Sequence, residues 1–243
     1  MTTANGRSAR ETILARVREA LRVPAPLPHM TSHAAVEAAA SGPDRLAILP
    51  LEVARPWLPD GGETADERLA ILTENLRRLR AEVHRAADLT TAAGQVATLA
   101  RERGWKRVAW HAHPAVEAAV AAVGCDTYRL EADGFDKDAL EACDAGITAC
   151  EAAVAQTGSI LVSSATCGGR ALSILPHAHI VIVTLDQILG TLGDALDAVR
   201  ERHAGRLPSM LSFITGPSRT GDIERILVLG AHGPKELFVI LVG

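Results

Sequence analysis

The chain has 243 residues, a formal net charge of −4 at pH 7, and 3% aromatic against 48% hydrophobic residues. This composition predicts a sizeable, mostly aliphatic core, and the charged fraction of 22% argues against a wholly disordered chain. Lys and Arg do not gather in a stretch typical of nucleic-acid binding. Arg77, Arg78 and Arg80 lie close together, but we interpret them as a solvated helix face. No nucleic-acid partner is therefore predicted.

The cysteines and the apolar runs bear on cofactors and location. Cys125, Cys143, Cys150 and Cys167 contain no C-x-x-C pair, so no metal site and no iron–sulfur cluster is predicted within the chain. Residues 1–18 are polar and charged, which does not predict a signal peptide. Apolar runs such as 180–183 are too short to span a bilayer. We expect a cytoplasmic protein with reduced thiols and no membrane partner.

Residues 1–62 differ from the rest of the chain in their pattern of apolar residues and prolines. Ser8 and Glu11 form a capping box, and apolar residues then recur at helical spacing, which predicts a helix over 9–22. Prolines from Pro24 to Pro59 break any long element after it. We interpret 1–62 as an N-terminal helix and an extended Pro-rich arm that packs on the body, with a contact in a homo-oligomer as a further role.

Residues 63–243 are interpreted as one α/β domain. Short apolar runs alternate with helical patterns, which is typical of parallel strands joined by helical crossovers. We expect an open, mostly parallel sheet with helices on both faces, mixed at one edge. Two apolar runs near the end, 225–229 and 237–242, predict a terminal antiparallel hairpin. The other predicted strands are 82–86, 107–110, 127–130, 158–163, 179–184 and 210–215, and the predicted helices are 64–84, 91–103, 114–123 and 192–203.

The segment TGPSRTGDIE, 215–224, is the first candidate site. Gly216 permits close backbone approach, while the hydroxyls of Ser218 and Thr220 and the guanidinium of Arg219 suit a phosphate or carboxylate. It follows a predicted strand, and ligands of open α/β sheets bind at the carboxyl ends of strands. The alternative is a capped tight turn in which Arg219 pairs with an acidic residue of 222–224.

A second candidate lies in 156–170. Thr157 and Gly158 open a predicted strand, and the small-residue loop after it carries Cys167, two glycines and Arg170, which could contact an anion. The loop matches neither a Walker motif nor G-x-G-x-x-G, and a purely structural loop is its alternative. Cys167 has no assignable His partner, so we interpret it as an inert buried thiol.

Histidines form the third candidate. His232 lies in a glycine-flanked loop where an acid–base group could act, although we assign it no catalytic role. His111 and His113, like His177 and His179, form H-x-H pairs, which metal sites can use. No carboxylate stands at a helpful spacing, so we interpret both pairs as polar residues at strand ends and predict no metal.

The late segments together resemble the LutC/YkgG family, whose members are called lactate utilization protein C and contain a LUD domain. The resemblance rests on Thr157-Gly158-Ser159, the Leu175-Pro176 run with His179, GPSRTGDIE, and LGAHGP before a closing strand. It covers 147–243. It implies a fold similar to the NagB/RpiA/CoA-transferase-like group, which includes 5-formyltetrahydrofolate cyclo-ligases.

The resemblance also implies a function. It implies an accessory role, beside the iron–sulfur proteins LutA and LutB, in oxidising L-lactate to pyruvate, with the clusters in those partners and no cofactor in this chain. The alternative is a small-molecule binding protein or enzyme of the CoA-transferase-like class that takes a phosphate- or carboxylate-bearing ligand. Thr157, Gly158, Arg170, Gly216, Ser218, Arg219, Thr220 and His232 are the predicted ligand-binding residues. Catalytic residues are not assigned.

One departure concerns Gln156, where many family members resemble E-T-G. Related CoA-transferases use a glutamate as covalent nucleophile, and a glutamine cannot do so. Glu151 is a doubtful replacement, because five residues upstream in a strand would place it on the opposite face. The sequence thus argues against acyl transfer at this position.

Overall fold

The computed structural model describes residues 9–20, 22, 59–131, 134–220, 228–230 and 232–243. The chain divides into two compact units, Met1–Pro56 and Trp57–Gly243. In the first, α1 (Ala9–Ala20) matches the predicted helix, and it exposes the apolar side chains of Ile13, Leu14 and Val17. The predicted arm lies outside the described residues, and its packing on the body stays a prediction.

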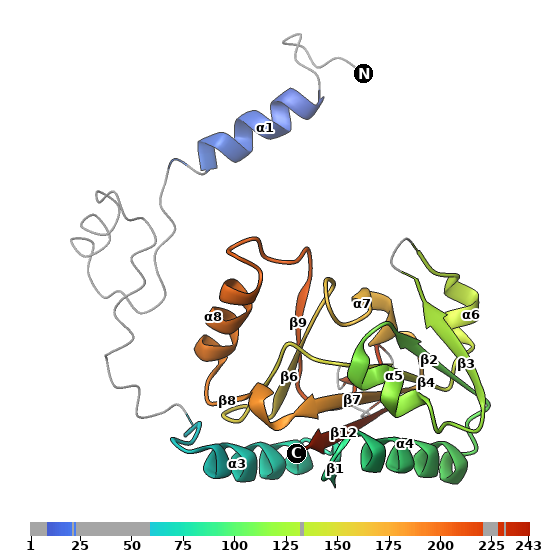
Figure 1. The fold of residues 1–243 in the computed structure, drawn as a ribbon. Helices are drawn as coiled ribbons and strands as arrows, with labels where there is room; N and C mark the ends of the chain where they lie inside the picture. Colours follow the sequence, from blue (N-terminus) through green and yellow to red (C-terminus); the bar gives the residue numbers. More distant parts are fainter. Residues whose placement is uncertain (1–8, 21, 23–58, 132–133, 221–227, 231) are drawn as a thin grey trace. The chain divides into compact units, whose positions relative to one another are not determined.

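A six-stranded sheet forms the centre of the second unit (Figure 1). All of its pairings are parallel, as the alternation of strands and helices predicts. The strands, in spatial order, are β1 (Glu82–Ala86), β12 (Glu236–Val242), β7 (Ala178–Thr184), β4 (Ala145–Thr148), β2 (Arg107–His111) and β3 (Asp126–Leu130).

The predicted terminal hairpin is wrong. β12 lies between β1 and β7 and pairs in parallel with both, so it does not fold back on the residues before it. The cause is visible in its composition: six of its seven residues, 237–242, are apolar and buried, which a strand covered on both faces requires. Residues 225–227 lie outside the described part of the chain, whereas β11 (Val228–Leu229) pairs with β10 (Arg219–Thr220) in a small antiparallel ribbon.

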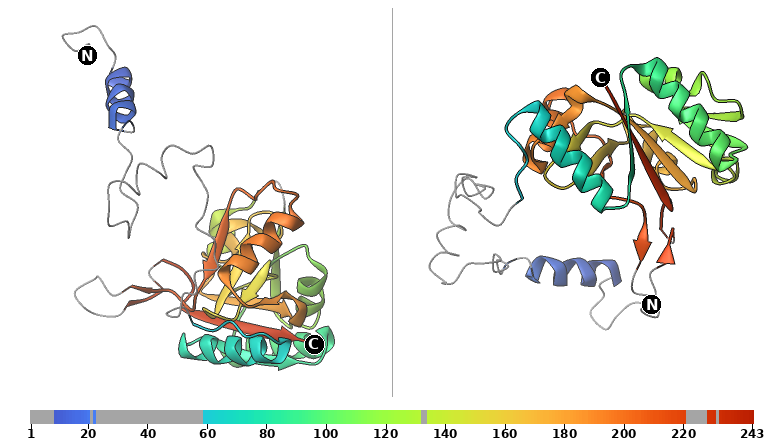
Figure 2. Two further views of the ribbon diagram at one scale, coloured as in Figure 1. Left: turned by 90° about the vertical axis from the view of Figure 1, so that its left-hand side faces the viewer. Right: turned by 90° about the horizontal axis from the view of Figure 1, so that it is seen from below.

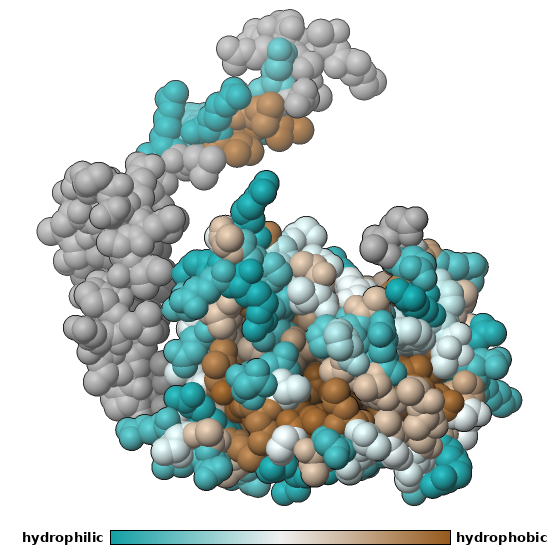
Figure 3. Space-filling view, in the orientation of Figure 1, coloured by the Kyte–Doolittle hydropathy of each residue, from teal (hydrophilic) through white to brown (hydrophobic). Residues whose placement is uncertain are grey.

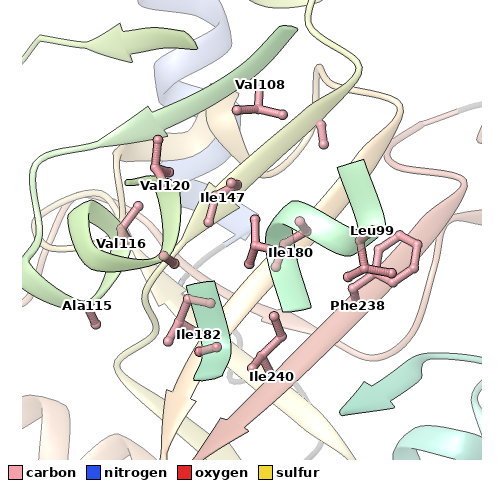
Figure 4. Close-up of a cluster of buried hydrophobic side chains, with 14 of the residues drawn as sticks. Leu99, Val108, Ala115, Val116, Val120, Ile147, Ile180, Ile182, Phe238 and Ile240 are labelled. Atoms are coloured by element: carbon pink, nitrogen blue, oxygen red, sulfur yellow. The ribbon is translucent and has the colours of Figure 1, made fainter. Parts of the chain in front are cut away.

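Helices cover both faces of this sheet. On one face, α4 (Leu89–Arg103) and α5 (Pro114–Val120) pack on alternate strand residues such as Ile180 and Phe238 (Figure 4). On the other face lie α3 (Ala65–Arg78), α6 (Lys137–Glu141) and α7 (Gly169–Leu172). The right-hand view of Figure 2 shows β12 running between α3 and α4. The α/β class with helices on both faces is confirmed.

Helix α3 ends earlier than the predicted 64–84. Thr64 and Glu67 form a capping box at its start, as the residue types favour. Its end at Arg78 is fixed by Arg80, whose φ of 68° lies in the left-handed region and turns the chain towards β1. Leu72 and Leu76 of this helix are fully buried against the sheet.

A second, smaller sheet holds the antiparallel pairs that we expected at one edge of the main sheet. β5 and β6 pair antiparallel, as do β6 and β9, while β5 and β8 are parallel. One face of this second sheet packs against α3 and the main sheet. Helix α8 covers the other face through Ala195 and Val199. Its strands are β8 (Ile188–Leu189), β5 (Ala152–Val154), β6 (Ser159–Ser163) and β9 (Leu211–Ile214), and α8 spans Leu192–Arg202.

The surface is mostly polar on the face seen in Figure 3, with an apolar area between α8 and the helices α3 and α4. Leu192 and Leu196 of α8 are among the exposed large apolar side chains. Within the described ranges, no helix combines the length and apolar character needed to cross a membrane.

Candidate ligand-binding site

The strand order creates a crevice between β2 and β4. From β2 the chain crosses to β3 on one side, whereas from β4 it returns to this sheet in β7 on the other side. The segments that follow the two strands therefore diverge at their carboxyl ends. Ligands of open α/β sheets bind at such a switch point.

A cavity of about 610 Å³ opens beside this crevice. We call it the carboxyl-edge cavity. Its walls come from the ends of β2 and β3 and from the loop between β6 and α7, and its size is typical of a small-molecule site. The described lining residues are His111, Ala112, Leu130, Glu131, Gly134, Phe135, Ser164, Ala165, Thr166, Gly168, Gly169, Arg170 and Ala171.

His111, the last residue of β2, is buried in the wall of the cavity. The Ala149 N–H donates to its Nε2 across 3.2 Å, which assigns the ring proton of the neutral form to Nδ1. Burial, followed by the nearby His113, lowers the pKa of His111 to about 4. The imidazole is therefore neutral at pH 7 and offers a hydrogen-bond donor without a charge.

A second buried histidine, His179, lies on β7, the strand next to β4. His179 is 1% exposed, and its Nε2 stands 2.9 Å from Thr148 Oγ1. Its Nδ1 is buried without a hydrogen-bond partner among the described residues. Burial, with a smaller contribution from His111, lowers the pKa of His179 to about 3. The interior beside the crevice thus holds two neutral imidazoles.

Glu151 is the most heavily bonded polar residue of this region. It follows β4, is 1% exposed, and accepts hydrogen bonds from Ser163 Oγ at 2.6 Å and from Thr166 Oγ1. Arg202 and His203, at the end of α8, bind the same carboxylate, with His203 Nε2 at 3.1 Å. Burial alone would raise its pKa, but the hydrogen bonds from these side chains outweigh burial and lower it to about 2.

This network ties the cavity to the second sheet. Thr166 lines the cavity and contacts Glu151, so the carboxylate fixes the loop that forms one wall. Because all of its neighbours bind it as an anion, Glu151 is held as a structural acceptor and is poorly placed to attack a substrate. Burial also raises the pKa of the Cys167 thiol, in agreement with its interpretation as inert.

The predicted residues divide between two places. Arg170 lines the carboxyl-edge cavity, whereas Gly158 packs against Asn75 and Leu79 at the end of α3. Thr157 Oγ1 donates to Ser159 Oγ at 2.8 Å, and Ser159 Oγ is 2.8 Å from Thr215 Oγ1. Thr157 and Gly158 therefore lie near the start of residues 216–219, which we call the GPSR segment, and the structure does not bring them to the cavity that Arg170 lines.

The predicted location of the GPSR segment is wrong. Pro217 and Arg219 lie in a groove with Glu82 and Glu236, the first residues of β1 and β12, and therefore at the amino edge of the main sheet. The reason is the connection: the strand before this segment, β9, belongs to the second sheet and runs antiparallel to β6. A rule about the ends of parallel strands does not apply to it.

The other predicted residues of this segment are placed as follows. The backbone of Ser218 bonds to Pro234 and Gly230, which fastens the segment to the LGAHGP turn, and His232 is exposed. The side chain of Thr220 and the acidic residues at 222 and 224 lie outside the described residues, and so does their proposed pairing with Arg219.

Sequence reasoning missed His111 as a lining residue of the cavity and Glu151 as the acceptor that fixes Thr166 in its wall. His111 was visible only as half of an H-x-H pair, in which His113 instead caps α5 by accepting the Ala115 N–H at 3.3 Å. Glu151 and Gln156 stand at opposite ends of β5, so they do not share a strand as the alternation argument assumed. Gln156 donates from Nε2 to the Pro59 carbonyl at 2.8 Å. In the part of the chain that the structure describes, no three His, Cys, Asp or Glu side chains form a metal-binding group.

Comparison with known proteins places the chain in a family. The model of the LUD domain matches residues 69–242. Proteins named Lactate utilization protein C are similar to it: that of Deinococcus radiodurans is 39% identical over 122 residues (50% of this chain, 56% of that protein), and that of Bacillus subtilis is 35% identical over 123 (49% and 51%). The chain spans about half the length of the curated relatives it matches.

A solved structure is similar as well. The crystal structure of a DUF162 family protein from Deinococcus radiodurans superposes with a TM-score of 0.59 and 29% identity, covering 75% of this chain and all of that one. The family resemblance seen in the sequence is thereby confirmed. The chain belongs to the LUD domain family.

Proposed function

We propose that this chain acts in lactate utilization, as an accessory protein of an iron–sulfur system that oxidises L-lactate to pyruvate, and that the carboxyl-edge cavity holds the small carboxylate. The observation that carries the proposal is the cavity beside the switch point, which both the neutral His111 and the cation Arg170 line. Its setting is a LUD domain whose similar proteins are named Lactate utilization protein C.

The lining suits a 2-hydroxy acid. The guanidinium of Arg170 matches a carboxylate in geometry and charge, and it is exposed enough to reach into the cavity. The His111 Nδ1–H can donate to the substrate's hydroxyl or carbonyl oxygen, and the Thr166 hydroxyl oxygen, whose proton is donated to Glu151, can accept from the substrate's hydroxyl. Phe135 and Leu130 offer apolar surface for a methyl group.

The oxidation itself removes two electrons and two protons from lactate. We assign the electrons to iron–sulfur clusters in LutA- and LutB-like partner proteins, as the family resemblance implies, and give this chain the binding of the acid. His111, neutral and only weakly basic, is suited to hydrogen bonding and poorly suited to keep a proton. This division needs no cofactor in the chain.

The second candidate is a binding protein or enzyme of the CoA-transferase-like class with a larger anionic ligand. The cavity volume favours it, because about 610 Å³ exceeds what a three-carbon acid fills. Acyl transfer through Glu151 is not supported, since the carboxylate is already bound by four side chains.

Two experiments test these functions. Isothermal calorimetry with L-lactate and pyruvate should show binding that weakens about tenfold in Arg170→Gln, as loss of a charge-assisted pair predicts. Arg200→Gln, in the exposed pair with Asp197 on α8, is the matched control. Equal binding of the acid by wild type and both variants would show that the acid does not bind in this cavity.

The accessory role is tested by reconstitution. Lactate-dependent dye reduction by the two iron–sulfur partners should require this chain. Full activity of the partners alone would overturn the accessory role. Tight binding of CoA esters or folates, with none of lactate or pyruvate, would favour the second candidate.

A further inference from the structure

A separate groove of about 290 Å³ lies at the amino edge of the main sheet, at the opposite strand ends from the cavity. We call it the amino-edge groove. It brings together segments far apart in the chain: the turn after α3, the GPSR segment, and the start of β12. Its described lining residues are Arg80, Glu82, Pro217, Arg219, Lys235, Glu236, Leu237 and Phe238.

The two carboxylates of the groove share one cation that lies outside its lining. Arg103 of α4 binds both, through Nη2 to Glu82 Oε2 at 3.0 Å and through Nη1 to Glu236 Oε1. Its guanidinium also stands 5.0 Å from the ring centre of Phe238, which holds it against the body. The acidic side chains are thus committed to a cation outside the lining.

The three cations of the groove are not committed in this way. Arg80, Arg219 and Lys235 form no ion pair with a described carboxylate, and they donate no side-chain hydrogen bond to a described residue. Three like charges facing one small groove repel one another. A bound anion would relieve this repulsion.

The backbone beside these side chains has specific requirements. At Gly230, with φ of +78°, a Cβ would overlap the aliphatic stem of Lys235, so the missing side chain makes room for that stem. Gly216 has φ of +90°, which favours glycine, and it lies in ordinary van der Waals reach of the Arg219 guanidinium. Arg80 keeps its left-handed backbone while donating its N–H to the Arg77 carbonyl at 2.9 Å. The cations therefore sit on a defined frame.

We propose that the amino-edge groove binds a phosphate monoester of a small metabolite. A phosphate group carries a charge of about −1.5 to −2 at pH 7 and accepts several hydrogen bonds, which suits two guanidinium forks and an ammonium. Counting Arg103, four cations face two carboxylates, and the excess charge matches a dianion. The volume limits the ligand to a small molecule.

The rival explanation is compensation of the α3 helix dipole. Arg80 and Arg219 lie near the helix end, and a Gly216 Cβ would stand 2.8 Å from the Leu79 carbonyl oxygen. Lys235, at the start of β12, has no such role. Its contribution separates the two explanations.

The test is calorimetry with glycerol phosphate and inorganic phosphate. Wild type should bind the ester, Lys235→Met and Arg219→Gln should each weaken binding about tenfold, and raising the salt should weaken it further. Arg200→Gln is the control. Lys235→Met keeps the stem over Gly230, so its fold should be intact, which a thermal melt confirms.

Three outcomes would overturn the proposal. They are absence of phosphate binding at millimolar concentration, equal binding by wild type and both groove variants, or loss of binding in Arg170→Gln alone, which would move the ligand to the other cavity. A drop in melting temperature of Arg219→Gln without phosphate binding would establish dipole compensation instead. The proposal is independent of the lactate function, because failure of lactate binding leaves these outcomes unchanged.

Discussion

Beside the carboxyl edge of the main sheet, His111 and Glu151 are buried and hydrogen-bonded within the fold, whereas at the amino edge three cations are exposed and bound to no described carboxylate. Buried groups must find partners in the fold, because leaving them unpaired costs several kcal/mol. Exposed Arg and Lys side chains are solvated, so they can remain unpaired until a ligand binds. The buried His111 and Glu151 are therefore committed to the fold, whereas the exposed cations of the amino edge can bind an anion from solution.

The largest expected effect comes from breaking the Glu151 network. Glu151→Ala would leave Arg202, Ser163 and Thr166 without their shared acceptor, and we expect a loss of about 3 kcal/mol in the free energy of unfolding. Chemical denaturation measures it. Glu201→Ala, one residue before Arg202 and exposed, should change stability by less than about 0.5 kcal/mol. Equal losses in the two variants would mean that the network adds no stability.

Acid should destabilise the protein in two steps. The folded-state pKa values of His111 and His179 lie at about 4 and about 3, below the ordinary 6.5, so the unfolded chain takes up protons first and stability falls as the pH drops below about 6.5. Glu151, lowered from 4.5 to about 2, adds a further loss below about 4.5.

Two variants attribute these two steps to particular residues. Denaturation as a function of pH should show a shallower slope between about 6.5 and 4 in His179→Gln, which can keep a bond to Thr148 without titrating. Glu151→Gln should flatten the curve below about 4.5 only. A slope between pH 6.5 and 4 that His179→Gln leaves unchanged would contradict the role given to this ring.

A smaller effect is expected from the loop over His111. Gly168 has φ of +73°, and a Cβ there would stand 2.8 Å from His111 Cβ, so Gly168→Ala should lose about 1 to 2 kcal/mol and shift the cavity wall. Gly169 has φ of +76° but open space around it, so Gly169→Ala carries the backbone strain without the clash. Carboxylate binding should weaken in the first variant and persist in the second. The same affinity in both would show that the loop contact does not shape the cavity.

The sequence predicted elements better than their assembly. Apolar runs and apolar residues at helical spacing predicted most helices and strands, because these signals are local. It could not show that 158–163 and 210–215 form a second sheet, since β6 is buried throughout and its pattern fits any central strand. The four-residue β4 and three-residue β5 were missed because they are too short to show a period.

The same contrast between local signals and the assembly of distant segments applies to the two sites. Arg170 was recognisable as a cation beside a glycine loop, but its neighbour His111 lies 59 positions earlier in the chain, on another strand. Arg80 resembled part of a solvated helix face, and only the left-handed turn after α3 directs it to the GPSR segment. Tertiary juxtaposition of this kind has no counterpart in spacing along the chain.

The smallest effect is expected from Arg103, which lines neither site and tests how the two edges differ. Arg103→Met removes the cation that occupies Glu82 and Glu236, so both carboxylates would face the amino-edge groove and attract its cations. Phosphate binding should weaken several-fold, while stability should fall by less than about 1 kcal/mol, because the pairs are partly exposed. Arg101→Met, two residues away on α4, is the control for both the binding and the stability measurement, because Thr98 is the one side chain that Arg101 bonds among the described residues. If phosphate binds as tightly without Arg103, the carboxylates do not compete for the groove cations, and the charge balance argued for the groove is wrong.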